Sequence, residues 1–232
     1  MSATRALPRD LTPGRDGPAI IAHGGGNNLA TARKFLDAGA DYLEVDLWLH
    51  KGRFEARHER RMRWLPLLFE KWYLSRPARG DYGLAQLLAE CEERGAGVFL
   101  DLKNGGAASA ALLRTTIATS GHSGRVVASS QQWRTLRAIN EITPDVDSFY
   151  SIDVQAKLDL FRSVVDRDTR PRGVSCRHSL LSRRVVRELH DRGLLVVAWT
   201  VDEMDRAREL VDWGVDGLTT HNVAEMRTEF VQ

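Results

Sequence analysis

Eight short runs rich in β-branched residues recur along the chain, and each is followed by a stretch with the periodicity of an amphipathic helix. The short runs cover residues 19–23, 42–48, 97–102, 125–129, 147–151, 172–176, 194–200 and 215–219. The amphipathic stretches cover residues 29–38, 84–94, 106–119, 131–142, 154–166, 182–192, 203–213 and 222–229. Eight strand–helix repeats are the number that closes a parallel barrel, so the pattern predicts a single (β/α)8 TIM barrel of the α/β class.

An open doubly wound sheet would show the same alternation, and it often carries a GxGxxG phosphate turn after its first strand. Here the first run ends in the sequence HGGGN at residues 23–27, which does not match that turn. The count of eight strands also favours a closed barrel over an open sheet.

Length and composition fit one globular domain. The chain has 232 residues, of which 43% are hydrophobic and 28% are charged, as in an ordinary folded protein. Its formal net charge of +2 gives no reason to expect a nucleic-acid partner. Cys91 and Cys176 show no metal-ligand spacing, and we expect two free, buried thiols in a reducing compartment.

Residues 1–18 carry Pro, Gly and charge without periodicity, so we interpret them as an N-terminal extension and residues 19–232 as the barrel. The extension lacks the apolar core of a signal peptide, and no apolar run approaches the length of a membrane span. We therefore expect a cytoplasmic protein without a stable membrane anchor.

Ionisable residues gather where the second and third predicted strands end, and barrel enzymes keep their chemistry at the carboxyl ends of the strands. Glu44 and Asp46 lie two apart, as do Asp101 and Lys103, so each pair shares one face of its strand. The leucines and valine between them would face the helices, which turns all four charged residues into the barrel. Three carboxylates thus converge on a small volume.

Close, buried carboxylates are costly unless a cation neutralises them. Three negative charges and the positive charge of Lys103 leave two negative charges, which one divalent cation would balance. Ligands that are all oxygen favour Mg²⁺ or Ca²⁺ over zinc. A salt-bridge network that closes the barrel is the alternative interpretation of the same residues.

Two histidines flank this predicted site. His23 ends the first strand, and the Lys51-Gly52 pair predicts a tight turn that would bring His58 back over the barrel mouth. Histidines suit general acid–base catalysis because their pKa lies near neutrality.

Several segments resemble the glycerophosphodiester phosphodiesterases of the PLC-like phosphodiesterase superfamily. The opening IIAHGGGNN and the later ARKFLDAGADYLEVDLWLHKGRFEARHE resemble the start of that family, and GVFLDLK resembles its third strand. VVASSQQW resembles the fourth strand, and VVAWTVDEMDRARELVDWGVDGLTT the seventh and eighth. The likeness extends from residue 19 to about residue 225.

The resemblance implies a barrel of the PLC-like phosphodiesterase type and a metal-dependent phosphodiesterase that acts by histidine acid–base catalysis. It implies the following roles: metal ligation by Glu44, Asp46 and Asp101, acid–base catalysis by His23 and His58, and a phosphate contact from Lys103.

The sequence departs from the family pattern at a few positions. Gly24 stands where the family has an arginine that contacts phosphate, and His221 stands where it has an aspartate. Asp101 replaces the common glutamate, and its Asp-Leu-Lys form is similar to the sphingomyelinase D-like phospholipases. These departures leave the phosphate contact and the substrate open.

Three further residues are candidates for substrate contacts. Trp199 ends the seventh strand and either stacks on the alcohol portion of the substrate or packs as a core aromatic. Ser129 ends the fourth strand, where a phosphate contact and a packing role are both open. Arg177 follows the sixth strand, with His178 beside it, and is a candidate for the phosphate contact absent at Gly24.

The segment 59–82 mixes large apolar residues with five arginines. It could form an apolar lid for a lipid chain and touch a membrane surface transiently, but we favour a short helix packed on the barrel rim.

Three functions are consistent with the sequence. The first is hydrolysis of small glycerophosphodiesters to an alcohol and glycerol 3-phosphate. The second is a lysophospholipase D-like or sphingomyelinase D-like activity on lipids such as lysophospholipids. The third, of another class, is a catalytically inactive barrel used for binding.

Overall fold

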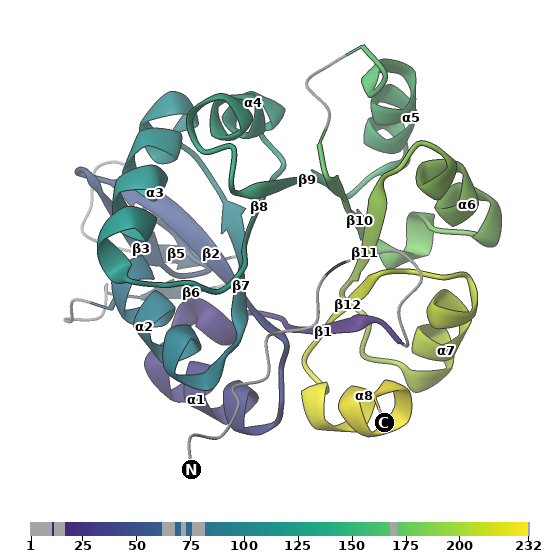
Figure 1. Cartoon of the computed structure of the whole chain (residues 1–232), viewed down its shortest axis with the longest axis horizontal. Coiled ribbons are helices and arrows are strands. Elements are labelled where there is room, and N and C mark those ends of the chain that lie inside the picture. Colours follow the sequence, from purple (N-terminus) through teal and green to yellow (C-terminus); the bar gives the residue numbers. More distant parts are fainter. Residues whose placement is uncertain are drawn as a thin grey trace.

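A closed barrel of eight parallel strands forms the centre of the computed structural model, which describes residue 11 and residues 17–61, 68–70, 73–75, 82–167 and 171–231 (Figure 1). In order around the barrel the strands are β1 (Ala19–Ala22), β2 (Tyr42–His50), β7 (Gly97–Leu102), β8 (Val126–Ser130), β9 (Asp147–Ile152), β10 (Gly173–Arg177), β11 (Leu195–Trp199) and β12 (Gly217–Thr220). Parallel pairing of β1 with both β2 and β12 closes the ring. The predicted fold class is confirmed.

Eight α-helices surround the barrel (Figure 1). They are α1 (Leu29–Asp37), α2 (Leu84–Arg94), α3 (Gly106–Ser120), α4 (Trp133–Ile142), α5 (Gln155–Val164), α6 (Arg183–Asp191), α7 (Met204–Asp212) and α8 (Val223–Phe230), with short 3₁₀ turns η1 (Gly25–Asn27) and η2 (His178–Leu180). Local chemistry sets several of the boundaries. The Ser182 hydroxyl accepts the Val185 N–H at 3.3 Å and caps α6, while Gly95 ends α2 with a φ of 70°.

Two apolar layers flank the strands. Residues that alternate along each strand pack either against the helices or into the barrel interior. The interior layer consists of Leu11, Ala19, Ile21, Tyr42, Phe99, Val127, Phe149, Leu195 and Val197. Leu43, Val45 and Leu47 belong to the helix-facing layer. Glu44 and Asp46, which alternate with them, therefore face the barrel interior.

One residue of the predicted N-terminal extension reaches this interior layer. Leu11 is 3% exposed, and it lies so close to Gly217 that a Cβ on that glycine would meet its side chain at 3.0 Å. The segment before residue 19 therefore contributes an apolar contact to the barrel.

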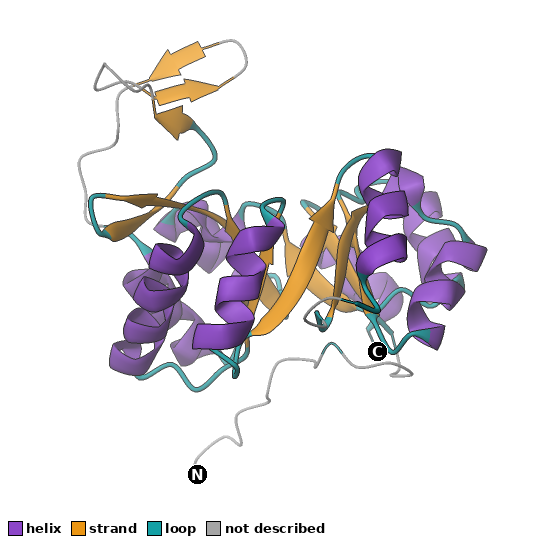
Figure 2. Ribbon diagram, turned by 90° about the horizontal axis from the view of Figure 1, so that it is seen from above, coloured by secondary structure: helices purple, strands orange, loops and turns teal. Residues whose placement is uncertain are grey.

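Strand β2 continues beyond the barrel into an antiparallel hairpin with β3 (Arg53–Ala56). Its turn is formed by Lys51 and Gly52, both with positive φ, as the sequence predicts. Beyond the hairpin, β4 (Arg60–Arg61), β5 (Leu68–Glu70) and β6 (Tyr73–Ser75) form a small antiparallel sheet, which Figure 2 shows standing apart from the barrel.

The expectation of a short helix in segment 59–82 is wrong for its described part, because those residues pair as strands. The large apolar residues Trp64, Leu65 and Trp72, on which the lid hypothesis partly depends, lie outside the described residues. In the helices that the structure describes, none combines the length and the apolar character needed to cross a bilayer.

Candidate active site at the barrel mouth

A cluster of three carboxylates lies at the carboxyl ends of two neighbouring strands. Glu44 and Asp46 project from β2 and Asp101 from β7, with Asp46 and Asp101 in register across the strand pair. One oxygen from each carboxylate lies within 4.8 Å of the other two. We call these three residues the carboxylate cluster.

Lys103 is the cation that the described structure places in this cluster. Its Nζ lies 2.6 Å from Asp46 Oδ1 and also donates to Asp101. Burial lowers the pKa of Lys103, but Asp101 and Asp46 outweigh it, so the net shift is upward and the lysine stays charged.

Burial and mutual repulsion act on the carboxylates themselves. Burial, then Asp46 and Asp101, raise the pKa of Glu44 well above its usual range, and the Gly24 N–H and Lys103 only partly offset them. Burial also raises the pKa of Asp101, against the lowering effect of Lys103. One lysine therefore does not neutralise the carboxylate cluster.

These residues fit a hard divalent cation. The donors are three carboxylates whose oxygens converge within the reach of one ion, and oxygen donors are those that Mg²⁺ and Ca²⁺ take. Burial and the neighbouring acids disfavour the charged form of Glu44, and such an ion would stabilise that form.

The glycine-rich turn after β1 is hydrogen-bonded to the carboxylate cluster. The Gly24 N–H donates to Glu44 Oε2 at 2.6 Å, and Asn27 both donates to Asp46 Oδ2 at 2.8 Å and accepts the Asp46 N–H at 2.9 Å. Gly26 allows this close approach, because a Cβ there would lie 2.7 Å from the Val45 Cβ. The triglycine thus serves to bring backbone onto the cluster.

His23 lies between β1 and this turn. Its Nδ1 lies 3.1 Å from Thr200 Oγ1, and its ring centroid lies 4.6 Å from that of His221. Burial, then the neighbouring His221, lower the pKa of His23 to about 4 against the raising effect of Asp46 and Asp202. At neutral pH His23 is therefore uncharged.

His221 is held in place by Asp202. The Asp202 carboxylate accepts the His221 N–H at 2.8 Å and the Thr220 hydroxyl at 3.0 Å, and its other oxygen lies 2.8 Å from His221 Nδ1. Burial raises the pKa of Asp202, but these bonds outweigh it and the net shift is downward.

His58 comes two residues after the β2–β3 hairpin and is exposed. It is close enough to the other groups to lower the pKa of both His23 and Asp101. The hairpin therefore returns His58 to the mouth, as the turn at residues 51–52 predicts.

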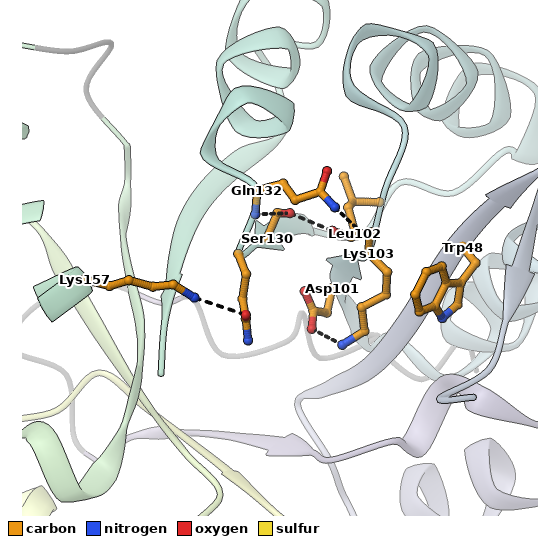
Figure 3. A pocket seen from close by; sticks show the side chains of 8 residues that line it. Trp48, Asp101, Leu102, Lys103, Ser130, Gln132 and Lys157 are labelled. Atoms are coloured by element: carbon orange, nitrogen blue, oxygen red, sulfur yellow. Dashed lines mark hydrogen bonds and ion pairs between the residues drawn. The ribbon is translucent and has the colours of Figure 1, made fainter. Parts of the chain in front are cut away.

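A cavity of about 340 Å³ opens beside Asp101 and Lys103 (Figure 3). Trp48 lines it on one side and Lys157 on the other, with residues 130–132 between them. The mouth thus combines a candidate cation site, three histidines (His23, His58 and His221) and a small polar pocket.

Comparison with known proteins agrees with this arrangement. Residues 100–225 match the model of the glycerophosphoryl diester phosphodiesterase family, which is more than half of the chain. The chain belongs to the glycerophosphoryl diester phosphodiesterase family. It is accordingly a phosphoric diester hydrolase, and the predicted family and enzyme class are confirmed.

Solved structures share the fold of this family member. A glycerophosphodiester phosphodiesterase from Parabacteroides distasonis has a TM-score of 0.76 at 19% identity, covering 94% of this chain and 98% of that one. A phosphodiesterase from Oleispira antarctica, in complex with the product sn-glycerol-3-phosphate, has a TM-score of 0.71 at 18% identity, covering 91% and 96%. The enzyme from Thermotoga maritima has a TM-score of 0.70 at 17% identity, covering 93% and 99%. No curated protein matches the sequence closely.

The sequence offers three candidate substrate-contact residues, and the structure places them at different depths. Ser129 is buried and in register with Asp101 on the next strand. Arg177 and Trp199 are paired in register at the ends of β10 and β11, which the strand order places across the mouth from β2 and β7. Arg177 is exposed, while the Trp199 indole N–H is buried without an acceptor in the described residues.

Sequence reasoning missed several residues of the mouth. Thr200 and Asp202 follow the seventh strand, where the sequence analysis named only Trp199. Lys157 lies in the first turn of α5. Their position after the carboxyl ends of strands was the available signal. His178 is directed elsewhere, because its Nδ1 accepts from Arg206 at 3.4 Å.

Proposed function

We propose that this enzyme hydrolyses small glycerophosphodiesters to an alcohol and glycerol 3-phosphate, with residues 19–232 as the catalytic barrel. The observation that carries the proposal is the carboxylate cluster with Lys103 at its centre and two histidines beside it. No structural role needs this combination of charges at the barrel mouth.

Glu44, Asp46 and Asp101 would hold one divalent cation, Mg²⁺ or Ca²⁺. When bound, such an ion supplies positive charge to the non-bridging oxygens of the phosphate as negative charge develops in the transition state. Lys103 adds a second positive charge at the same place, because its ammonium is fixed between Asp46 and Asp101.

His23 is suited to act as the general base. Its lowered pKa keeps it uncharged near neutral pH, so it can accept the proton of an attacking water. Thr200 Oγ1 engages Nδ1, which leaves Nε2 as the atom that takes the proton. A base at Nε2 requires the tautomer in which the Nδ1–H donates to the threonine oxygen.

His58 is suited to act as the general acid. It is exposed at the mouth, near Asp101, where it can give a proton to the leaving alcohol oxygen. The water proton goes to His23, the His58 proton goes to the alcohol, and the P–O bond to the head group breaks as the new P–O bond forms.

The test is release of glycerol 3-phosphate from glycerophosphocholine and glycerophosphoinositol, with lysophosphatidylcholine as the lipid alternative, in Mg²⁺, Ca²⁺ or EDTA. Glu44→Gln should lower turnover by about 100-fold or more, because it removes one ligand charge. Glu141→Gln, at an exposed position on α4, is the matched control and should retain full activity.

Turnover in EDTA equal to that in Mg²⁺ or Ca²⁺ would refute the metal assignment. A preference for lysophosphatidylcholine would transfer the proposal to the lipid substrate class, and metal binding without any turnover would favour the inactive barrel.

A further inference from the structure

The pocket beside the carboxylate cluster has a second polar wall that the proposed catalytic steps do not use. Its lining runs from Asp101 and Lys103 through residues 130–132 to Lys157 (Figure 3). At about 340 Å³ it lies near the lower end of the range for small-molecule sites, roughly 300–1,000 Å³. It suits a small head group better than an acyl chain.

The wall offers both donors and acceptors. The Lys157 ammonium lies 2.7 Å from Asp153 Oδ1 and 3.2 Å from the Gln131 side-chain oxygen. An ammonium has three N–H donors, and an amide offers both N–H and C=O groups. Since Asp153 balances the charge of Lys157, the wall is polar but close to neutral. Hydroxyl groups, which both donate and accept, match such a surface.

This wall is fixed relative to Lys103. The Gln132 side chain donates to the Lys103 carbonyl at 2.7 Å, and the Ser130 hydroxyl donates to the Leu102 carbonyl at 2.6 Å. The Ser130 oxygen also accepts the Gln132 N–H at 3.0 Å. A head group that reaches Lys157 is therefore held at a set distance from the catalytic lysine.

On the opposite side, the Arg57 guanidinium lies 5.3 Å from the Trp48 ring centroid and is held there by Glu55 at 3.0 Å. A quaternary ammonium would have to displace this arginine to stack on the ring face that it covers.

We propose that this pocket is the head-group subsite and that it selects a polyol, such as a glycerol or inositol head group, over choline. Lys157 and Gln131 are its specificity-determining residues. The substrate part of this inference rests on the proposed diesterase function, but binding of the free alcohol does not.

Binding is tested first, by saturation-transfer NMR of the full chain with free myo-inositol or free choline in EDTA. The wild type should give a signal with myo-inositol and little with choline. Lys157→Met and Gln131→Ala should each weaken the inositol signal several-fold. Lys34→Met, an exposed lysine on α1, is the matched control and should leave it unchanged. A signal from choline alone, or none from inositol, would overturn the proposal.

Turnover measurements then separate the head-group subsite from the proposed diesterase activity. The wild type should favour glycerophosphoinositol over glycerophosphocholine by about 10-fold in kcat/KM, and Lys157→Met should remove most of that ratio. Metal-dependent turnover without head-group preference would overturn the subsite while leaving the hydrolase intact. Absence of turnover with retained inositol binding would refute the hydrolase and leave the subsite.

Discussion

The carboxylate cluster and the single carboxylate of Asp202 lie at the same end of the barrel but have opposite pKa shifts. In the carboxylate cluster, Glu44 is buried and Asp101 half-buried beside another acid, and their pKa values are raised. On the other side, Asp202 accepts the His221 and Thr220 donors and its pKa is lowered. Burial is the largest cause of the upward shifts of Glu44 and Asp101, whereas Asp202 is more exposed and its hydrogen-bond donors outweigh the effect of burial.

This contrast separates a structural acid from a functional one. Asp202 is complete as it stands, because its oxygens are engaged by donors that position His221 against His23. The carboxylate cluster has too few donors for its charge, and only an added cation would complete it. A deficit of positive charge, more than the presence of acids, therefore marks the proposed metal site.

The largest expected effect concerns His23, whose pKa is influenced by both Asp46 of the carboxylate cluster and Asp202. His23→Ala should lower kcat/KM by about 100- to 10,000-fold, because it removes the proposed general base. The wild-type rate should fall as the pH drops through the pKa of His23, about 4, because a protonated base accepts no proton. A pH profile of kcat/KM measures this acid limb.

A limb near the ordinary histidine pKa, about 6.5, would show that burial and His221 do not set the charge of His23. Unchanged activity in His23→Ala would remove this residue from the catalytic steps altogether. The melting temperature of the variant serves as the control for folding.

A second effect concerns the stability of the carboxylate cluster. A cation at 100 times its dissociation constant should stabilise the wild type by about 2.7 kcal/mol, or roughly 5–10 °C in melting temperature. Glu44→Gln should lose most of this gain. In EDTA near neutral pH it should melt at or above the wild type, because it removes a buried carboxyl whose charged form is disfavoured there.

The pH dependence of this difference has a definite sign. The folded pKa of Glu44 is raised, so its protonated form contributes stability at low pH, and this is lost as the pH rises through the folded value. In EDTA, the melting temperature of the wild type should therefore rise relative to that of Glu44→Gln as the pH falls from neutrality toward about 5. Scanning calorimetry measures the stabilisation by the cation and the pH dependence in EDTA. Equal stabilisation of the two proteins by the cation would contradict the proposed metal site.

The barrel and the carboxylate cluster could be predicted from the sequence because both depend on regular strand geometry. Glu44 and Asp46 alternate with apolar residues, and alternation fixes which face is buried. Segment 59–82 could not be predicted, because its apolar residues show neither strand nor helix periodicity. Lys157 comes from α5 and Asp202 from the loop between β11 and α7, and only the closed barrel brings them to one mouth.

The smallest effect belongs to Asp202. Asp202→Asn should cost about 0.5–1 kcal/mol near neutral pH, a modest figure because the group is partly exposed and screened. Its folded pKa is lowered, so its contribution is present above the unfolded value and is lost as the pH falls through the folded one. Urea unfolding should thus separate variant and wild type near neutrality and bring them together at about pH 3 or below.

Asp205→Asn is the matched control, because Asp205 is fully exposed on α7 and pairs only with a surface arginine in the described structure. Asp202 contacts His221 and not the reacting atoms, so Asp202→Asn should change kcat no more than a few-fold. A loss as large as that of His23→Ala would mean that the Asp202–His221 pair takes part in catalysis. The contrast between a complete and an incomplete set of carboxylates would then have to be abandoned, because both would serve the reaction.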